Sequence, residues 1–398
     1  MRVLIVTPYP INKPTNGGQI RAASISEAYR SAGYDVQEIG NCHSYQEQEG
    51  YVGNLPLDIM DRHAMGWSLH KVGDMAMGET FYREDEWFDK LANNVRGVPD
   101  LIDVEQPWMF RFARRLCLEK FHKSIPIIYS SHNVEFEIRD KMLKDFAPDR
   151  DDTEVIKAIK EIEIEAIKYS AGVMCVSEAD RKWTAQYTDK EIILAPNGVS
   201  AWHSTARARK KVSTMTNEGA FALFCGSWYQ PNVTGFFDML GGPFGSMDAG
   251  EYVVIAGSAG TAIKDDVRLL KSAKLGEHLL TPGIIEQEEL DALRDMAHAI
   301  IIPITQGGGT NLKTAEALWS GHYVIATSVA MRGFEEFRDA RGVFIADTPG
   351  HFKRILRKVM AMPPLKLSSE EWEQRRIVLW ESCLSGLSAL AKKTIREG

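Results

Sequence analysis

The sequence has few cysteines and no long apolar run. Its five cysteines are scattered over 398 residues, and none forms a Cys-x-x-Cys pair or has a histidine at zinc-finger spacing. An odd number of isolated cysteines argues against a disulfide framework and favours a reducing compartment. The first apolar run ends at Pro8, too soon for a signal peptide or for the ~20 residues that cross a bilayer. We therefore expect a cytoplasmic protein.

Several binding and catalytic motifs are also missing. No Asp-x-Asp motif follows an apolar strand, so no metal ion is indicated for holding a diphosphate. No Gly-x-Ser-x-Gly elbow is present, which argues against an α/β-hydrolase. The glycine spacing before Lys313 differs from that of the Gly-x-x-x-x-Gly-Lys-Ser/Thr phosphate loop. The net charge of −7 argues against nucleic acid as the main partner, since binders of the phosphate backbone carry a basic face.

The composition is that of an ordinary globular protein, with 44% apolar and 25% charged residues. At about 150 residues per domain, the length predicts two domains. Residues 3–7 form an apolar run typical of a strand covered on both faces. A helix is expected at 19–32, closed by Gly33, with a second strand at 36–39. This order is a right-handed βαβ unit.

The strand and helix pattern continues in two series. The first adds a helix at 154–169 and strands at 101–104, 125–130, 172–176 and 192–194. Residues 46–94 are less regular and are interpreted as inserted helices and loops. The second series has strands at 221–225, 252–256, 278–280, 299–303, 323–327 and 343–346, and the polar, basic stretch 200–219 is the expected linker. The pattern predicts an α/β protein of two Rossmann-like, doubly wound domains facing a cleft.

The domain boundary is expected at 200/201. The first domain would span 1–200 and the second 201–369, with a terminal helical segment at 370–398 crossing back to the first domain. An apolar stripe at three- and four-residue spacing supports that terminal helix.

The strongest site signal is a strand, a glycine run and a helix at 301–317. Glycines let the backbone approach a ligand closely, and a helix starting near Thr310 would direct its free N–H groups at an anion. Lys313 adds positive charge, and Glu316 lies on the same face. A tight turn without a ligand is the alternative. The residues expected to border the ligand are Gly307, Gly308, Gly309, Thr310, Asn311, Leu312, Lys313 and Glu316.

Other small or polar residues follow strands, at the edge where open α/β sheets bind ligands. An ordinary turn explains any one of them alone, and a core histidine is the alternative for His132. Together they predict a binding edge on both sheets. These residues are Gly17, Gly18 and Arg21 after the first strand, His132 after 125–130, Gly226, Ser227 and Asn232 after 221–225, and Gly257 and Gly283.

These motifs together resemble a known family. The chain is similar over nearly its whole length to the retaining glycosyltransferases of the GT-B fold, of the family-four type (glycosyl transferases group 1). The segments that carry the resemblance are the opening Pro, Gly-Gly and Arg, residues 131–133, 176–180, 196–199, Gly226-Ser227 with Pro231-Asn232, Ala256-Gly257, and 307–316.

The resemblance implies a nucleotide-sugar donor, UDP-linked by preference or GDP-linked, with no further cofactor and no metal. Lys313 would neutralise the diphosphate, Glu316 would hold the ribose, and His132 would touch the transferring sugar. Gly283 and Ile284 would border the base, and Gly17 and Gly18 would approach the phosphates. Catalysis would proceed with retention, through positioning and charge stabilisation. The acceptor would be a glycan or lipid-linked molecule, as in polysaccharide biosynthesis.

The chain departs from the family pattern at two places. Gly308 stands where many members have a first glutamate, and Trp228 to Asn232 replace the usual Arg and Lys. Both departures leave the donor sugar open. An epimerase or hydrolase of the same fold, and a non-catalytic nucleotide-sugar-binding protein, remain as alternatives.

A basic, aromatic helix is expected around 108–123. Such a helix suits peripheral contact with the inner membrane face. The alternative is a solvated helix whose apolar side packs on the core.

Overall fold

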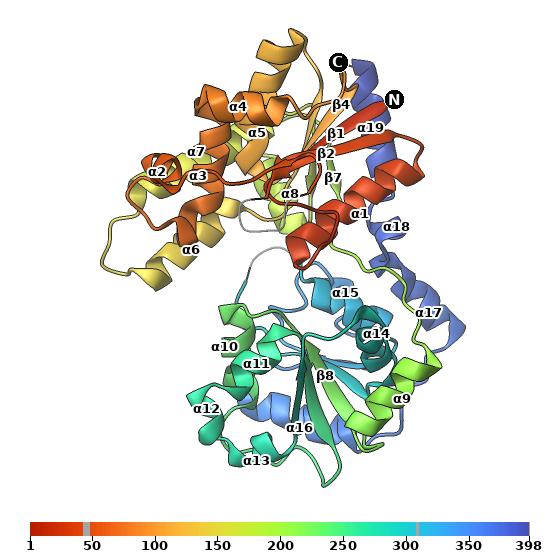
Figure 1. Ribbon diagram of the computed structural model, residues 1–398. Coiled ribbons are helices and arrows are strands. Elements are labelled where there is room, and N and C mark those ends of the chain that lie inside the picture. The colour runs from red at the N-terminus through yellow and green to blue at the C-terminus, as the bar shows by residue number, and fades with distance from the viewer. Residues whose placement is uncertain (43–47, 308–309, 398) are drawn as a thin grey trace. The chain divides into compact units, whose positions relative to one another are not determined.

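The chain forms two compact units (Figure 1). The computed structural model describes residues 1–42, 48–307 and 310–397. Unit 1 consists of Met1–Pro196 with Cys383–Gly398, and unit 2 of Asn197–Ser382. Residues 370–382 therefore lie in unit 2, whereas the sequence pattern grouped all of 370–398 with the first domain. No helix in the described part of the chain is long and apolar enough to cross a membrane.

Unit 1 is built on a parallel sheet with the strand order β3-β2-β1-β4-β5-β6-β7. The central strand β1 is apolar and buried because helices cover both faces, and β4 is buried throughout although it carries Asp103 and Glu105. The strands are β1 (Arg2–Thr7), β2 (Asp35–Asn41), β3 (Tyr51–Val52), β4 (Leu101–Glu105), β5 (Ile127–Ser130), β6 (Gly172–Cys175) and β7 (Ile192–Leu194).

The first helix of unit 1 begins and ends at local signals. The Asn16 side chain accepts a hydrogen bond from the Gln19 N–H and caps the start of α1. Gly33 adopts a φ of 85° just after the helix, which confirms its predicted role in stopping it. The helices of unit 1 are α1 (Gly17–Ser31), α2 (Leu57–His63), α3 (Leu69–Arg83), α4 (Asp85–Ala92), α5 (Phe110–Arg115), α6 (Glu135–Phe146), α7 (Thr153–Tyr169), α8 (Glu178–Thr184) and α19 (Leu387–Glu397).

The basic segment at 108–123 is tied to its own unit. It is divided into a short 3-10 turn, α5 and a π-helical turn. Arg111 pairs with Glu79 at 2.7 Å and with Glu165 at 2.6 Å between nitrogen and oxygen. Phe110 and Phe112 are buried in the core. These contacts favour the alternative of a helix packed on the core, because its central cation and aromatic rings are already engaged.

Unit 2 is also built on a parallel sheet, with the strand order β10-β9-β8-β11-β12-β13. The strands are β8 (Phe221–Cys225), β9 (Tyr252–Ala256), β10 (Leu279–Gly283), β11 (Ala299–Ile302), β12 (Tyr323–Ala326) and β13 (Val343–Ile345). The helices are α9 (Ala206–Met215), α10 (Gln230–Leu240), α11 (Ser258–Lys264), α12 (Val267–Leu270), α13 (Ala273–Glu277), α14 (Gln287–Met296), α15 (Leu312–Trp319), α16 (Pro349–Met360), α17 (Ser369–Arg375) and α18 (Trp380–Cys383).

The expected linker at 200–219 is wrong. Residues Ala206–Met215 form α9, which packs on α14. The Thr205 side chain caps the helix, and Ala208 and Val212 are buried. Alternating basic and apolar residues made an amphipathic helix resemble a polar linker, because its core-facing stripe is narrow.

Candidate functional site

The glycine loop of unit 2 leads from β11 into α15. The helix begins at Leu312, later than the expected start near Thr310, because the Asn311 side chain is the N-cap and accepts from the Lys313 N–H at 3.1 Å. Thr310 instead anchors the loop: its Oγ1 atom accepts from the Asn197 N–H at 3.1 Å. Gly307 has a φ of 142°, a conformation that favours glycine. The predicted residues Gly308 and Gly309 lie outside the described residues.

Lys313 and Glu316 line one small cavity beneath α15. Cys225 and Arg294 line it with them, and the other lining residues are apolar: Leu223, Phe224, Ile300, Ile301, Ile302 and Ala317. Burial lowers the pKa of Lys313, while Glu316 and Cys225 act in the opposite direction. A partly desolvated ammonium group attracts an anion more strongly than one in water does. The structure thus brings the two strongest predicted residues together.

Arg294 was missed from the sequence. Its Nη2 atom lies 2.7 Å from Glu316 Oε1, and its side chain is 11% exposed. Burial lowers the pKa of Arg294, but the charges of Glu316, Cys225 and Asp291 and the hydrogen bond to Glu316 together more than offset this, so the pKa is raised overall. The sequence held one signal that could have revealed Arg294: it lies on the apolar, inward-facing stripe of its helix, where an arginine needs a buried partner.

Three glycines among the other predicted positions in unit 2 hold strand ends together. Gly257 has a φ of 92°, and a Cβ atom there would lie 2.4 Å from the Gly226 carbonyl oxygen. The Gly257 N–H donates to the Gly283 carbonyl at 2.8 Å. Gly226, Gly257 and Gly283 therefore hold the ends of three strands together, which is the ordinary-turn alternative. Ile284, in contrast, is 84% exposed.

Asn232 is also engaged internally. Its Nδ2 atom donates to the Ser227 carbonyl at 2.8 Å, and the residue is buried. This contact shapes the loop before α10, and the predicted contact of Asn232 with a ligand stays a prediction. An amide side chain one turn into a helix reaches back to the preceding loop more easily than outward.

Arg21 of unit 1 lies in the interior. It is 1% exposed, and its Nη1 atom donates to the Ala195 carbonyl at 2.7 Å. Burial lowers its pKa, and the nearby carboxylates of Glu105 and Asp103 oppose this shift. Arg21 therefore lies among buried acids of its own unit, because it is one turn into α1 on the face toward the sheet. Its predicted contact with a ligand stays a prediction. Gly17 opens α1, and a Cβ atom at Gly18 would clash with the Tyr9 hydroxyl at 2.3 Å.

His132 forms a buried pair with Glu105. The His132 Nε2 atom lies 2.5 Å from Glu105 Oε2, and the side chains are 5% and 0% exposed. Burial and then the charge of Arg21 lower the pKa of His132 to about 3. Burial raises the pKa of Glu105 to about 7, against the opposing influence of Arg21 and Ser130. At neutral pH the imidazole is uncharged and the pair holds a single exchangeable proton between its two members.

Glu105 was also missed, although the sequence placed it directly after an apolar strand. The parallel pairing sets Glu105 opposite Ser130, two residues before His132. Gln106 follows with a φ of 63° and a ψ of 163°. A non-glycine residue in this region costs about 1–3 kcal/mol, and such residues cluster at functional sites.

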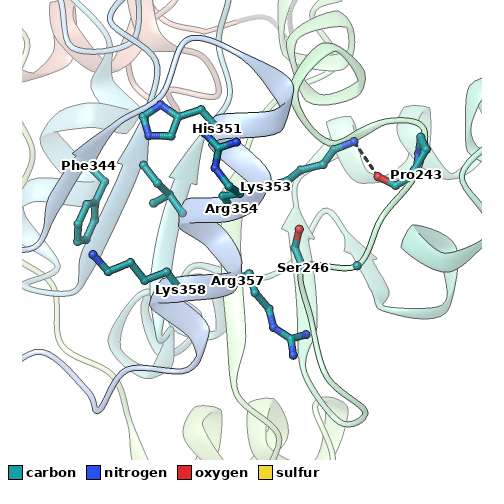
Figure 2. Close-up of a pocket in the computed structure, with 10 residues that line it drawn as sticks. Pro243, Ser246, Phe344, His351, Lys353, Arg354, Arg357 and Lys358 are labelled. Carbon is teal, nitrogen blue, oxygen red and sulfur yellow. Dashed lines mark hydrogen bonds between the residues drawn. The ribbon is translucent and has the colours of Figure 1, made fainter.

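A second hollow in unit 2 lies over α16 and has a volume of about 830 Å³ (Figure 2). His351, Arg354, Arg357 and Lys358 contribute basic side chains to it. Lys353 extends away from them, and its Nζ atom donates to the Pro243 carbonyl at 3.0 Å. None of the predicted site residues lines this hollow.

The sequence matches no protein-family model and no curated protein. Solved structures match over the full chain. Sucrose-phosphate synthase from Thermosynechococcus elongatus is 13% identical with both chains covered at 100% and a TM-score of 0.73. WaaG, a glycosyltransferase involved in lipopolysaccharide biosynthesis, is 12% identical with 99% of each chain covered and a TM-score of 0.60. HepE of Anabaena in complex with UDP is 11% identical, with 100% of this chain and 98% of HepE covered and a TM-score of 0.56. This full-length likeness, with one parallel sheet in each unit, confirms that the chain has the predicted GT-B fold.

Proposed function

We propose that this chain is a glycosyltransferase that moves a sugar from a nucleoside diphosphate sugar to a glycan or lipid-linked acceptor. The observation that carries the proposal is the placement of Lys313 and Glu316 in one cavity at the capped start of α15. The likeness to enzymes such as sucrose-phosphate synthase and WaaG supports it.

The diphosphate is the group that unit 2 suits best. The first N–H groups of α15 have no partner within the helix and carry the positive end of its dipole. Lys313 adds a full charge in a partly apolar setting. As the bond to the sugar breaks, negative charge grows on the leaving diphosphate, and these groups stabilise it without a protein nucleophile. This proposal includes retention of the anomeric configuration and independence from a metal ion.

The ribose and the sugar present hydroxyl groups, which need acceptors and neutral donors. The carboxylate of Glu316 accepts hydrogen bonds from ribose hydroxyls. In unit 1, the uncharged imidazole of His132 offers a ring nitrogen to a sugar hydroxyl while Glu105 fixes the ring. We propose a UDP-sugar as the donor, with a GDP-sugar second, and a cytoplasmic setting.

The test is a screen of the full chain against UDP-, GDP-, ADP- and TDP-sugars. A ligand that binds the native state raises the melting temperature. Donors that do so are then incubated with and without glycan and lipid-linked acceptors, and the free nucleotide is measured. We expect nucleotide release that depends on an acceptor. Release or isomerisation from the donor alone would identify a hydrolase or epimerase, and binding without turnover would identify a non-catalytic protein.

A further inference from the structure

Arg294 is a buried cation placed behind a candidate ligand residue. Its Nη2 atom lies 2.7 Å from Glu316 Oε1, and its Nη1 atom lies 3.2 Å from Asp291 Oδ1. Its guanidinium also lies over the Trp202 ring at 5.0 Å from the centroid. Contacts to α14, to α15 and to the segment before α9 hold the planar guanidinium in one orientation.

Lys313 shares the cavity but not the ion pair. It lies three positions before Glu316 on α15, where oppositely charged side chains commonly pair. The Arg294 contact engages the Glu316 carboxylate instead, and Lys313 forms no ion pair with any residue that the structure describes. The carboxylate is thus neutralised from one side, which weakens its pull on the ammonium group of Lys313.

We propose that Arg294 is a positioning residue that fixes the Glu316 carboxylate for the hydroxyls of a nucleotide's ribose and keeps Lys313 available for the diphosphate. The proposal rests on the proposed function and adds a source of specificity to it. A carboxylate has about four acceptor positions, and the Arg294 bond uses one of them. A rigid acceptor discriminates against an analogue that lacks the hydroxyl, because the buried polar group then has no partner.

The experiment compares ribonucleotides with their deoxy forms. UDP, ADP and GDP, and the 2′-deoxy and 3′-deoxy form of each, are titrated into the wild-type chain, Arg294→Gln, Arg294→Lys and Glu316→Gln. We expect the wild type to prefer the ribonucleotide over at least one deoxy form by roughly tenfold or more. Arg294→Gln and Glu316→Gln should each bring the ratio of the two affinities close to one. A variant that carries both changes, titrated in the same way, should lower this ratio no further.

The lysine variant covers the case in which Arg294→Gln does not fold. A lysine keeps the charge but cannot hold the carboxylate in one plane, so we expect a ratio between those of the wild type and Glu316→Gln. Arg209→Gln is the matched control. Arg209 pairs with Asp295, which lies on the same helix as Arg294, but Arg209 does not line the cavity. It should keep the wild-type ratio.

The possible failures are distinguishable. A folded Arg294→Gln or Arg294→Lys variant with the wild-type ratio would overturn the positioning role, while loss of the ratio in Glu316→Gln would leave the proposed function standing. A wild type that binds none of the three nucleotides would overturn both.

Discussion

The ends of the parallel strands in unit 1 and unit 2 both gather buried titratable side chains, but in different charge states. In unit 1, burial raises the pKa of Glu105 to about 7 and lowers that of His132 to about 3, which favours uncharged forms. In unit 2, Arg294 and Glu316 form an ion pair beside Lys313. The same sheet topology thus supports two chemistries: neutral hydrogen bonding suited to hydroxyls, and fixed charge suited to a diphosphate.

The largest effect is expected when the charge of unit 2 is removed. Lys313→Ala should lower turnover by roughly 10²–10³-fold, since it removes a preorganised charge from the leaving group. Steady-state release of the nucleotide measures this, with Lys210→Ala on the exposed face of α9 as the control. Wild-type turnover in a folded Lys313→Ala variant would show that the fixed charge of unit 2 does not act on the leaving group.

A smaller effect is expected at the buried pair of unit 1. Above pH about 7, ionised Glu105 accepts the Nε2–H of His132; below it, protonated Glu105 donates to Nε2 and the ring proton moves to Nδ1. The pH profile of kcat/KM should therefore bend near pH 7, and Glu105→Gln should remove the bend. Nitrogen chemical shifts of His132 follow the tautomer directly. Glu119→Gln, at an exposed ion pair, should leave the profile unchanged.

The contributions of Glu105 and His132 to the free energy of unfolding should change with pH in opposite directions. The raised pKa of Glu105 means that the folded state binds more protons than the unfolded state from pH about 4.5 to about 7, so its contribution falls as the pH rises. The lowered pKa of His132 means that the folded state binds fewer protons than the unfolded state between pH about 3 and about 6.5, so the contribution of His132 rises with pH. Urea unfolding at several pH values should show a steeper rise of stability with pH in Glu105→Gln than in the wild type. Parallel curves would contradict these shifts.

A modest effect is expected at the start of α15. Asn311→Ala removes the N-cap of the helix and should cost about 1 kcal/mol of unfolding free energy. Denaturant unfolding measures this, and Asn311→Asp should restore the stability because aspartate also caps. An unchanged midpoint in Asn311→Ala would contradict a stabilising role for the Asn311 cap.

No effect is expected from a chelator. The proposed neutralisation of the diphosphate by Lys313 and the α15 N–H groups predicts full turnover in EDTA. Loss of turnover that magnesium or manganese restores would show that unit 2 does not supply enough positive charge by itself.

The sequence predicted the features that are local in the chain. Apolar runs located most of the strands, although β3 (Tyr51–Val52) was missed, and Gly33 marked the end of α1. The role of the run before Lys313 as a ligand loop stays a prediction. The features that were missed join distant segments. Arg294 meets Glu316 from another helix, and Glu105 meets His132 from the neighbouring strand. Such pairs depend on register and helix packing, which no short pattern encodes.

Errors in the predicted boundaries have a similar origin. Thr310 and Asn311 are both good capping residues, but the Thr310 hydroxyl is bonded to the Asn197 N–H and Asn311 caps α15. Arg21 and Asn232 were expected at a ligand, yet their side chains reach backbone carbonyls inside their own units.

Calorimetric titration of UDP, ADP and GDP into the wild-type chain and Lys313→Ala tests the central claim most directly. The account predicts that the wild type binds at least one nucleoside diphosphate and that Lys313→Ala binds it at least about tenfold more weakly, as expected for the loss of a charge-assisted contact. Equal affinity in the two proteins, or no binding by the wild type, would contradict it.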